Sequence, residues 1–195
     1  MTFDGAVFEA REINAWRGDR HILRDVSFSV RPGEFLKVTG PNGVGKTTLL
    51  RVICGLLPAE TGELWWRGQS VRGRRDEFNF ELGHLGHLNS LKGDLTAREN
   101  LKFLAGLRTT LTAQTIDATL DRVGILSRGD LPARSLSAGQ KRRLALARLL
   151  LADAALWILD EPVTNLDTAG IRLVEELIVD HVALSFVRSA SDVQA

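Results

Sequence analysis

A glycine-rich segment, residues 40–47, constrains what this chain can fold into more than any other feature of the sequence. It reads Gly-Pro-Asn-Gly-Val-Gly-Lys-Thr and fits the pattern G-x-x-x-x-G-K-S/T at every position. Residues 35–39 before it are strand-like, and residues 48–54 after it suit a helix. Glycines let backbone N–H groups close around phosphate oxygens, and a helix start adds a positive dipole end. The segment therefore predicts a phosphate-binding loop between a strand and a helix.

The side chains of this loop indicate its ligand. Lys46 supplies a point charge for the outer phosphates of a nucleoside triphosphate, and the Thr47 hydroxyl is placed for Mg²⁺. We therefore expect ATP and Mg²⁺ as cofactors. The loop residues expected to bind ATP are Gly40, Pro41, Asn42, Gly43, Val44, Gly45, Lys46, Thr47 and Thr48.

Two carboxylates follow a short apolar run, residues 155–159, later in the chain. The run is typical of a strand buried on both faces of a parallel sheet. Asp160 would end this strand at the carboxyl edge of the sheet, where open α/β sheets bind ligands, and would hold Mg²⁺ there. Glu161 is placed to accept a proton from an attacking water, as a general base. The alternative is that Asp-Glu-Pro marks a strand-ending turn, which is less favoured in a chain with a phosphate loop.

The composition restricts the class of protein. With 195 residues, 44% of them hydrophobic and 25% charged, the chain is expected to form a soluble globular domain. The net charge of +1 gives no field that would attract nucleic acid, which is not expected as a partner. The single cysteine, Cys54, excludes a disulfide framework and is expected in core packing. No apolar run reaches the ~18 residues of a membrane span, so we expect any membrane role to require a partner.

Strand and helix patterns are mixed along the chain and indicate an α/β fold. A helical middle, about residues 95–151, separates the first strands from the strand that ends in carboxylates. Residues from Thr168 to about Val182 repeat apolar positions at helical spacing and predict a final helix. The strands expected in the first third are Val7 to Ala15, Val26 to Val30, Phe35 to Thr39 and Glu63 to Arg67.

A second helix start lies at residues 136–140, Leu-Ser-Ala-Gly-Gln. Ser137 and Gln140 have the spacing of a capping box, so Ser137 is expected to open a helix. The N-terminus of such a helix is an anion site. A capped helix with a basic, solvated face is the plainer interpretation, but it does not explain why the segment precedes the acidic-ended strand of a phosphate-loop chain.

This segment resembles the signature of ABC ATPases, usually written LSGGQ, with Ala138 in place of the first glycine. The resemblance extends from residues 25–28, Asp-Val-Ser-Phe, to Asp167. It implies a phosphate-loop NTPase core, a mixed sheet flanked by helices, together with an antiparallel β part and a helical ABC-specific subdomain. About 1–85 and 153–195 would form the core and about 88–152 the helical subdomain of one domain, 1–195.

The resemblance also implies partners. In ABC proteins the signature contacts the γ-phosphate held by a second protomer, so a homodimer is expected. Asp167 takes the position through which such dimers communicate, and a plain helix N-cap is the alternative, although both roles can hold together. A polytopic membrane subunit is expected as well, with this chain peripheral at the cytoplasmic face of the bacterial inner membrane. The residues expected at the ATP of the opposite protomer are Ser137, Ala138, Gly139 and Gln140.

Within the family the chain is most similar to the ATP-binding subunit of the haem exporter of cytochrome c maturation. The similarity rests on residues 31–34, 82–87, 95–101 and 157–162. It implies an ATP hydrolase that energises export of haem, or a related step, in cytochrome c biogenesis. A soluble or hydrolysis-impaired ABC ATPase without a transport role is the alternative.

Two departures from the family pattern bear on hydrolysis. The glutamine that ABC ATPases place between their subdomains falls near Leu88, which cannot ligate a metal. The family also has a late strand that ends in a switch histidine, whereas His181 lies within the final helix pattern and the tail is expected to be shortened or altered. We therefore expect this chain to bind ATP and hydrolyse it slowly.

Two smaller features have open interpretations. Trp16 is expected either to stack on adenine, since ABC proteins place an aromatic residue before their second strand, or to be a packing tryptophan. His84 and His87 have a spacing that suits a metal ion. No further Cys, His or acidic cluster completes such a site, so a loop or strand-end position is favoured for both.

Overall fold

The computed structural model describes residues 5–105, 111–179 and 182–187, which divide into two compact units. Unit 1 holds the described residues of Met1–His84, Ala155–Asp160 and Ile178–Ala195. Unit 2 holds those of Leu85–Ala154 and Glu161–Leu177. Each unit has its own cluster of buried hydrophobic side chains, and the two are described separately below.

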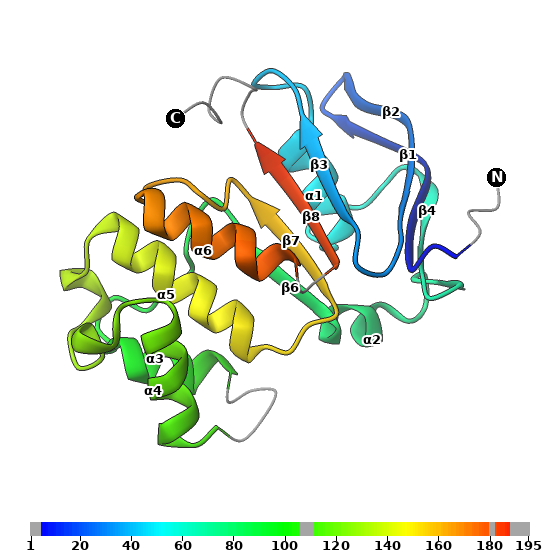
Figure 1. Cartoon of the computed structure of the whole chain (residues 1–195). Helices are drawn as coiled ribbons and strands as arrows, with labels where there is room; N and C mark the ends of the chain where they lie inside the picture. Colours follow the sequence, from blue (N-terminus) through cyan, green and yellow to red (C-terminus); the bar gives the residue numbers. More distant parts are fainter. Residues whose placement is uncertain (1–4, 106–110, 180–181, 188–195) are drawn as a thin grey trace. The chain divides into compact units, whose positions relative to one another are not determined.

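An antiparallel sheet forms the first part of unit 1 (Figure 1). Strand β1 (Phe8–Arg17) lies between β2 and β4, and its Phe8 pairs with Val30 of β2 and with Trp66 of β4. A tight turn at Gly18, where φ is +58°, starts the second strand at Arg20, earlier than the pattern beginning at Val26 predicts. In sheet order the strands are β2 (Arg20–Val30), β1 (Phe8–Arg17), β4 (Thr61–Trp66) and β5 (Gln69–Ser70).

The second sheet carries the strand ends that matter for function, and its order can be followed in Figure 1. The pairs β3–β8 and β7–β8 are parallel, with Thr39 opposite Val187 and Asp160 opposite Phe186. Because these strands are parallel, Thr39 and Asp160 end at the same edge of the sheet. In sheet order the strands are β3 (Phe35–Thr39), β8 (Val182–Val187), β7 (Leu156–Asp160) and β6 (Leu82–Leu85).

The end of the chain differs from the sequence prediction. Helix α6 (Thr168–Val179) ends before the predicted limit of about Val182, and Val182 begins strand β8 instead. The strand forms because β3 and β7 flank it and satisfy its backbone groups on both sides. A late strand is therefore present in the tail that was expected to be shortened or altered. His181 lies outside the described residues.

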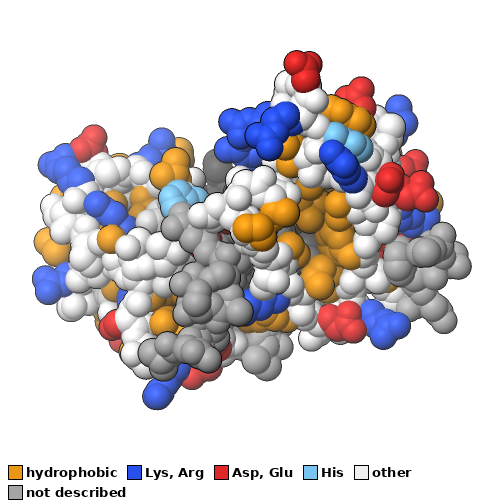
Figure 2. Space-filling model, turned by 90° about the horizontal axis from the view of Figure 1, so that it is seen from above, with side chains coloured by type: hydrophobic (Ala, Val, Ile, Leu, Met, Phe, Trp, Pro, Cys, Tyr) orange, Lys and Arg blue, Asp and Glu red, His pale blue; other side chains and the backbone are white. Residues whose placement is uncertain are grey.

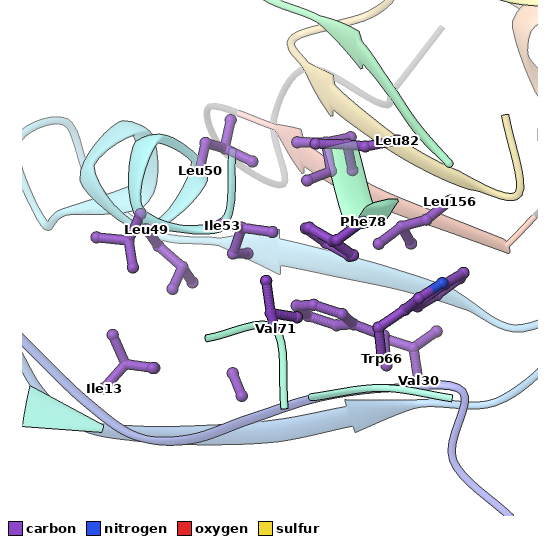
Figure 3. Packing of buried hydrophobic residues seen from close by; sticks show 14 of the residues in the cluster. Ile13, Val30, Leu49, Leu50, Ile53, Trp66, Val71, Phe78, Leu82 and Leu156 are labelled. Carbon is purple, nitrogen blue, oxygen red and sulfur yellow. The ribbon is translucent and has the colours of Figure 1, made fainter. Parts of the chain in front are cut away.

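The core of unit 1 lies where its two sheets and two helices meet (Figure 3). Helix α1 (Lys46–Ile53) buries one face, and helix α2 (Arg75–Phe80) buries Phe78, which stacks on Phe8 with ring centroids 6.0 Å apart. β7 is buried on both faces, as its apolar run predicts. The labelled core residues in Figure 3 are Ile13, Val30, Leu49, Leu50, Ile53, Trp66, Val71, Phe78, Leu82 and Leu156.

Unit 2 is helical and has a separate core. Helix α5 follows Ser137 and buries half of its residues, including Leu144 and Ala147. The loop after β7 groups with this unit, whereas the sequence prediction placed all of 153–195 with the core subdomain. The helices, counting short 3-10 turns, are α3 (Ala97–Ala105), α4 (Ala113–Arg122), η1 (Leu126–Arg128), η2 (Ala133–Ser135), α5 (Ala138–Leu151) and most of α6.

The surface is of mixed charge. Figure 2 shows Lys and Arg side chains interspersed with Asp and Glu side chains on the face drawn there. In the part of the chain that the structure describes, no helix combines the length and the apolar character needed to cross a bilayer.

Candidate functional site

The phosphate loop of unit 1 joins the end of β3 to the start of α1. Its glycines are required by geometry, because Gly40, Gly43 and Gly45 all have positive φ angles, of 152°, 83° and 110°. A Cβ atom on Gly45 would also lie 2.8 Å from Ile22 Cγ2, on the neighbouring strand β2. A side chain at Gly45 would therefore strain the backbone and push the loop away from β2.

The first turn of α1 is open at its N-terminus. Its N-cap is Gly45, which gives no side-chain hydrogen bond to the helix. The first N–H groups of an α-helix have no partner within the helix, so those of Lys46, Thr47 and Thr48 need an external acceptor. Thr47 is exposed and Thr48 half-buried, which leaves this helix start accessible to an anion.

The Lys46 side chain folds back over the loop. Its Nζ donates to Gly40 O at 2.5 Å and to Pro41 O at 3.0 Å. These two carbonyls hold the ammonium group above the loop, where the phosphates of a nucleotide would lie in a G-x-x-x-x-G-K-T segment. The loop, its lysine and the open helix start fit a nucleoside triphosphate.

Asp160 is the last residue of β7, at the sheet edge where β3 leads into the phosphate loop. A Mg²⁺ ion bound with a nucleotide needs one or two protein oxygens and takes its other ligands from phosphate and water. The carboxylate of Asp160 and the hydroxyl of Thr47 are oxygen ligands suited to Mg²⁺, and both belong to unit 1. The described residues contain no group of three or more His, Cys, Asp or Glu side chains that would hold a metal ion without phosphate.

Trp16 lies at the end of β1, and its ring stacks on His21 of β2. The ring centroids are 3.7 Å apart and the planes are 4° from parallel. His21 lines a pocket of about 480 Å³ together with Gly43 and Val44 of the phosphate loop. Trp16 is 41% exposed, so its ring is accessible from the surface. Sequence reasoning missed His21, because only the hairpin brings it onto Trp16.

His21 is also held by a hydrogen bond at the edge of its ring. Its Nε2 lies 2.8 Å from Asn14 Oδ1, an oxygen that also accepts from the backbone N–H of Asp25 at 3.1 Å. Asn14 Nδ2 in turn donates to Asp25 Oδ1 at 2.9 Å. This network fixes the plane of the imidazole and, through the stack, the plane of Trp16.

Glu161 begins the part of the chain that belongs to unit 2. It has a positive φ of 50°, which is unusual for a residue with a Cβ atom. Its side chain is 16% exposed, and Oε2 accepts from Thr164 Oγ1 at 3.4 Å. Strained backbone of this kind at the end of a strand often marks a functional position.

The segment that begins α5 forms the capping box that its sequence predicts. Gln140 N donates to Ser137 Oγ at 3.2 Å, and Ser137 N donates to Gln140 Oε1 at 3.0 Å. Ser137 is therefore the N-cap, and Ala138, Gly139 and Gln140 form the first turn. The capping-box prediction is confirmed.

Asp167 caps helix α6. Its Oδ1 accepts from Gly170 N at 2.9 Å and from Arg143 Nη2 of α5 at 2.7 Å. The hydrogen bond from Gly170 and then the Arg143 guanidinium lower the pKa of this carboxyl. The N-cap interpretation of Asp167 is confirmed.

The predicted site residues thus fall into two groups. Unit 1 carries the phosphate loop, Asp160 and Trp16, whereas unit 2 carries Glu161, the 137–140 segment and Asp167. Leu88, at the position of the family glutamine, is 77% exposed.

Comparison with known proteins gives a consistent result. Residues 23–164 match the family model described as ABC transporter. The Cytochrome c biogenesis ATP-binding export protein CcmA of Nitrosococcus oceani is 50% identical over 169 residues, which are 86% of this chain and 76% of that protein. The protein of the same name from Aliivibrio fischeri is 42% identical over 175 residues, 90% of this chain and 86% of the relative.

Solved structures agree on the fold. One titled as cbiO1 from Clostridium perfringens, part of the ABC transporter complex cbiONQ, superposes with a TM-score of 0.80 at 25% identity. The match covers 95% of this chain and 80% of that one. The predicted fold class, an α/β phosphate-loop core with an antiparallel β part and a helical subdomain, is confirmed. By its family match and by the identity of its relatives, this chain belongs to the ABC transporter family, among the ATP-binding export proteins of cytochrome c biogenesis.

Proposed function

We propose that this chain is the ATP-hydrolysing subunit of an ABC transporter that energises the export of haem, or a related step, in cytochrome c biogenesis. The observation that carries the proposal is the open N-terminus of α1, with Lys46 held above a complete phosphate loop. The relatives, whose names describe ATP-binding export in cytochrome c biogenesis, support the transport step.

ATP would be held by the residues of unit 1. The N–H groups at the start of α1, those of Lys46, Thr47 and Thr48, would present a positive helix end to the phosphates, and Lys46 would add a full charge. Thr47 and Asp160 would hold Mg²⁺, which when bound neutralises negative charge on the phosphate oxygens. Trp16, backed by His21, offers a flat apolar face to the adenine ring.

Glu161 would act as the general base. A carboxylate directly after the Mg²⁺-binding aspartate is in position along the chain to take the proton of an attacking water. Glu161→Gln removes the basic oxygen while it keeps the shape of the side chain, so ATP should still bind and turnover should be lost.

Two protomers would share each ATP. The capping box leaves the N–H groups of Ala138 and Gly139 outside its two hydrogen bonds, which suits an anion presented by a second subunit. Ser137 and Gln140 would complete this contact, and Asp167 would carry the communication between protomers. A polytopic membrane subunit would bind the dimer at the cytoplasmic face of the inner membrane, where this chain is peripheral.

Hydrolysis would be slow in the isolated chain. Leu88 offers no polar group at the position of the family glutamine, and the residues of β8, Val182–Val187, include no histidine. The loss of one donor to the transferred phosphate typically costs a factor of about 10² to 10³ in turnover. Because β8 is present, Val187→His at its end is the direct test, and a faster rate of phosphate release is expected. A rate that stays the same would show that the slow turnover has another origin.

The transport role is tested by complementation. A bacterium that lacks its own ATP-binding export protein for cytochrome c biogenesis should regain c-type cytochromes when it expresses this chain together with its membrane partner. The Glu161→Gln and Lys46→Ala variants, expressed at the same level, should not restore them. Restoration by all three proteins would refute ATP-driven export as the function.

The adenine contact has a separate test. Trp16→Ala should weaken the binding of ATP but leave the binding of inorganic triphosphate unchanged, because only ATP carries the base. Equal weakening of both ligands would assign Trp16 to packing instead.

A further inference from the structure

The carboxylate of Glu161 faces a histidine to which the proposed function assigns no role. His87 Nδ1 lies 3.8 Å from Glu161 Oε2, the oxygen that also accepts from Thr164 Oγ1. The Glu161 side chain is 16% exposed and that of His87 is 60% exposed. A nitrogen of one segment and a hydroxyl of another therefore converge on one oxygen of the carboxylate.

A buried arginine ties the two segments together. Arg142 of α5 is 3% exposed, and its Nη2 donates to Glu161 O at 2.7 Å while Nε donates to Pro162 O at 3.1 Å. Its Nη1 donates to Gly86 O at 2.8 Å and to Asn89 Oδ1 at 3.1 Å. One planar guanidinium thus holds the Gly86 backbone before His87, the Asn89 side chain after it and the backbone of Glu161 itself.

This arrangement limits where the two side chains can go. The guanidinium is rigid and presents its donors in a fixed fork, so the bonds to Glu161 O and Gly86 O set the spacing of the two loops. Glu161 also has a φ of 50°, a conformation that needs support from its surroundings to persist. Every residue in the arrangement belongs to unit 2.

We propose that His87 is a positioning residue for Glu161, held at the carboxylate by the Arg142 clamp. Its Nδ1–H would donate to Oε2 once a side-chain rotation shortens the 3.8 Å separation to the ~3 Å of a hydrogen bond. That contact would fix the carboxylate relative to the attacking water, whose proton Glu161 accepts. The inference rests on the proposed function, in which Glu161 is the general base.

The test measures single-turnover release of phosphate from γ-labelled ATP by the full-length chain, together with the Kd for ATP. His87→Ala should slow the chemical step by about 10- to 100-fold, as misplacement of a catalytic group does, with the Kd changed less than about twofold. His87→Asn places an amide nitrogen the same number of bonds from Cα as Nδ1, so it should keep most of the rate. A merely structural role would not give this split between rate and affinity, or this rescue.

Ser90→Ala is the matched control, because it removes an exposed hydroxyl from the same segment. It should leave both the rate and the Kd at the values of the parent chain. Because His87 is largely exposed, both His87 variants should melt within a few degrees of the parent.

The outcomes separate the inference from the proposed function. If Glu161→Gln is inactive and His87→Ala keeps the parent rate, the positioning role is refuted and the general base stands. A His87→Asn variant as slow as His87→Ala would likewise refute donation from Nδ1. If Glu161→Gln hydrolyses ATP as fast as the parent, the general-base assignment fails and the role of His87 falls with it.

Discussion

Two helices of this protein begin in opposite ways. Helix α1 starts at a glycine with a φ of 110° and has no side-chain cap, whereas α5 starts with a complete capping box. Neither helix has an acidic side chain in its first turn. Because α1 has no side-chain cap, its start leaves more backbone N–H groups for a ligand than the capped start of α5 does.

The open start of α1 suits a ligand that brings several negative oxygens, because its N–H groups have no acceptor of their own. The capped start of α5 is already stable by itself and keeps only the N–H groups of Ala138 and Gly139 outside the box. It is also packed tightly, since a Cβ atom on Gly139 would lie 2.7 Å from Asn165 O. We expect changes at α1 to affect ligand binding first and changes at α5 to affect stability first.

The largest effect is expected from Lys46→Ala in the phosphate loop. Charge-assisted hydrogen bonds contribute about 1.5 to 3 kcal/mol, so ATP should bind about 10- to 100-fold more weakly. Isothermal titration with ATP measures this change. Lys37→Ala in β3 removes an exposed lysine of the same unit and should leave the affinity unchanged. Unchanged affinity in Lys46→Ala would refute the phosphate site.

Gly139→Ala should destabilise the fold without weakening ATP binding to a monomer. The added Cβ meets a backbone oxygen, which cannot move as a side chain would, and overpacking of this kind costs about 1 to 3 kcal/mol. Urea unfolding measures the loss. Gly93→Ala is the control, because its Cβ would meet only Arg134 Cβ at an ordinary 3.6 Å. Equal stability of the two variants would show that the start of α5 is not tightly packed.

Ser137→Ala removes one half of the capping box and should cost about 1 kcal/mol of stability. Ser127→Ala, at an exposed position in η1, should change the free energy of unfolding by less than about 0.5 kcal/mol. If Ser137→Ala is as stable as this control, the cap contributes nothing and the contrast with α1 disappears.

The smallest effect concerns the opposite end of α1. Burial raises the pKa of the Cys54 thiol to about 12, while the charge of Arg75 lowers it in part. The folded state therefore keeps the thiol neutral, and the stability that this gives is complete below about pH 9 and lost as the pH rises toward 12. Near pH 7 the free energy of unfolding should therefore not change with pH through this thiol.

Urea unfolding at pH 7 and pH 10 tests this sign. The advantage of the parent chain over Cys54→Ala should shrink by about 1 kcal/mol at pH 10, since one pKa unit corresponds to 1.4 kcal/mol. In parallel, iodoacetamide should alkylate the folded chain at least about 10-fold more slowly than the unfolded chain at pH 9. A constant difference between pH 7 and pH 10 would contradict the raised pKa.

Much of the site was readable from the sequence because its signals are local. The phosphate loop needs glycines where φ is positive, and the capping box needs Ser137 and Gln140 three residues apart. Strand β7 was predicted because a strand buried on both faces must be apolar throughout. Such patterns depend on neighbours along the chain, so no tertiary contact is needed to recognise them.

The contacts among distant segments were decided by the tertiary structure alone. His21 stacks on Trp16 because a hairpin folds β2 back along β1, and Arg142 reaches Gly86 and Glu161 because the helix and two loops pack together. Strand β8 was not predicted, because its parallel neighbours on both sides supply hydrogen bonds that an isolated segment lacks. The local sequence determined the phosphate loop and the capped helix start. The packing of segments far apart in the chain decided which side chains lie against Trp16 and Glu161.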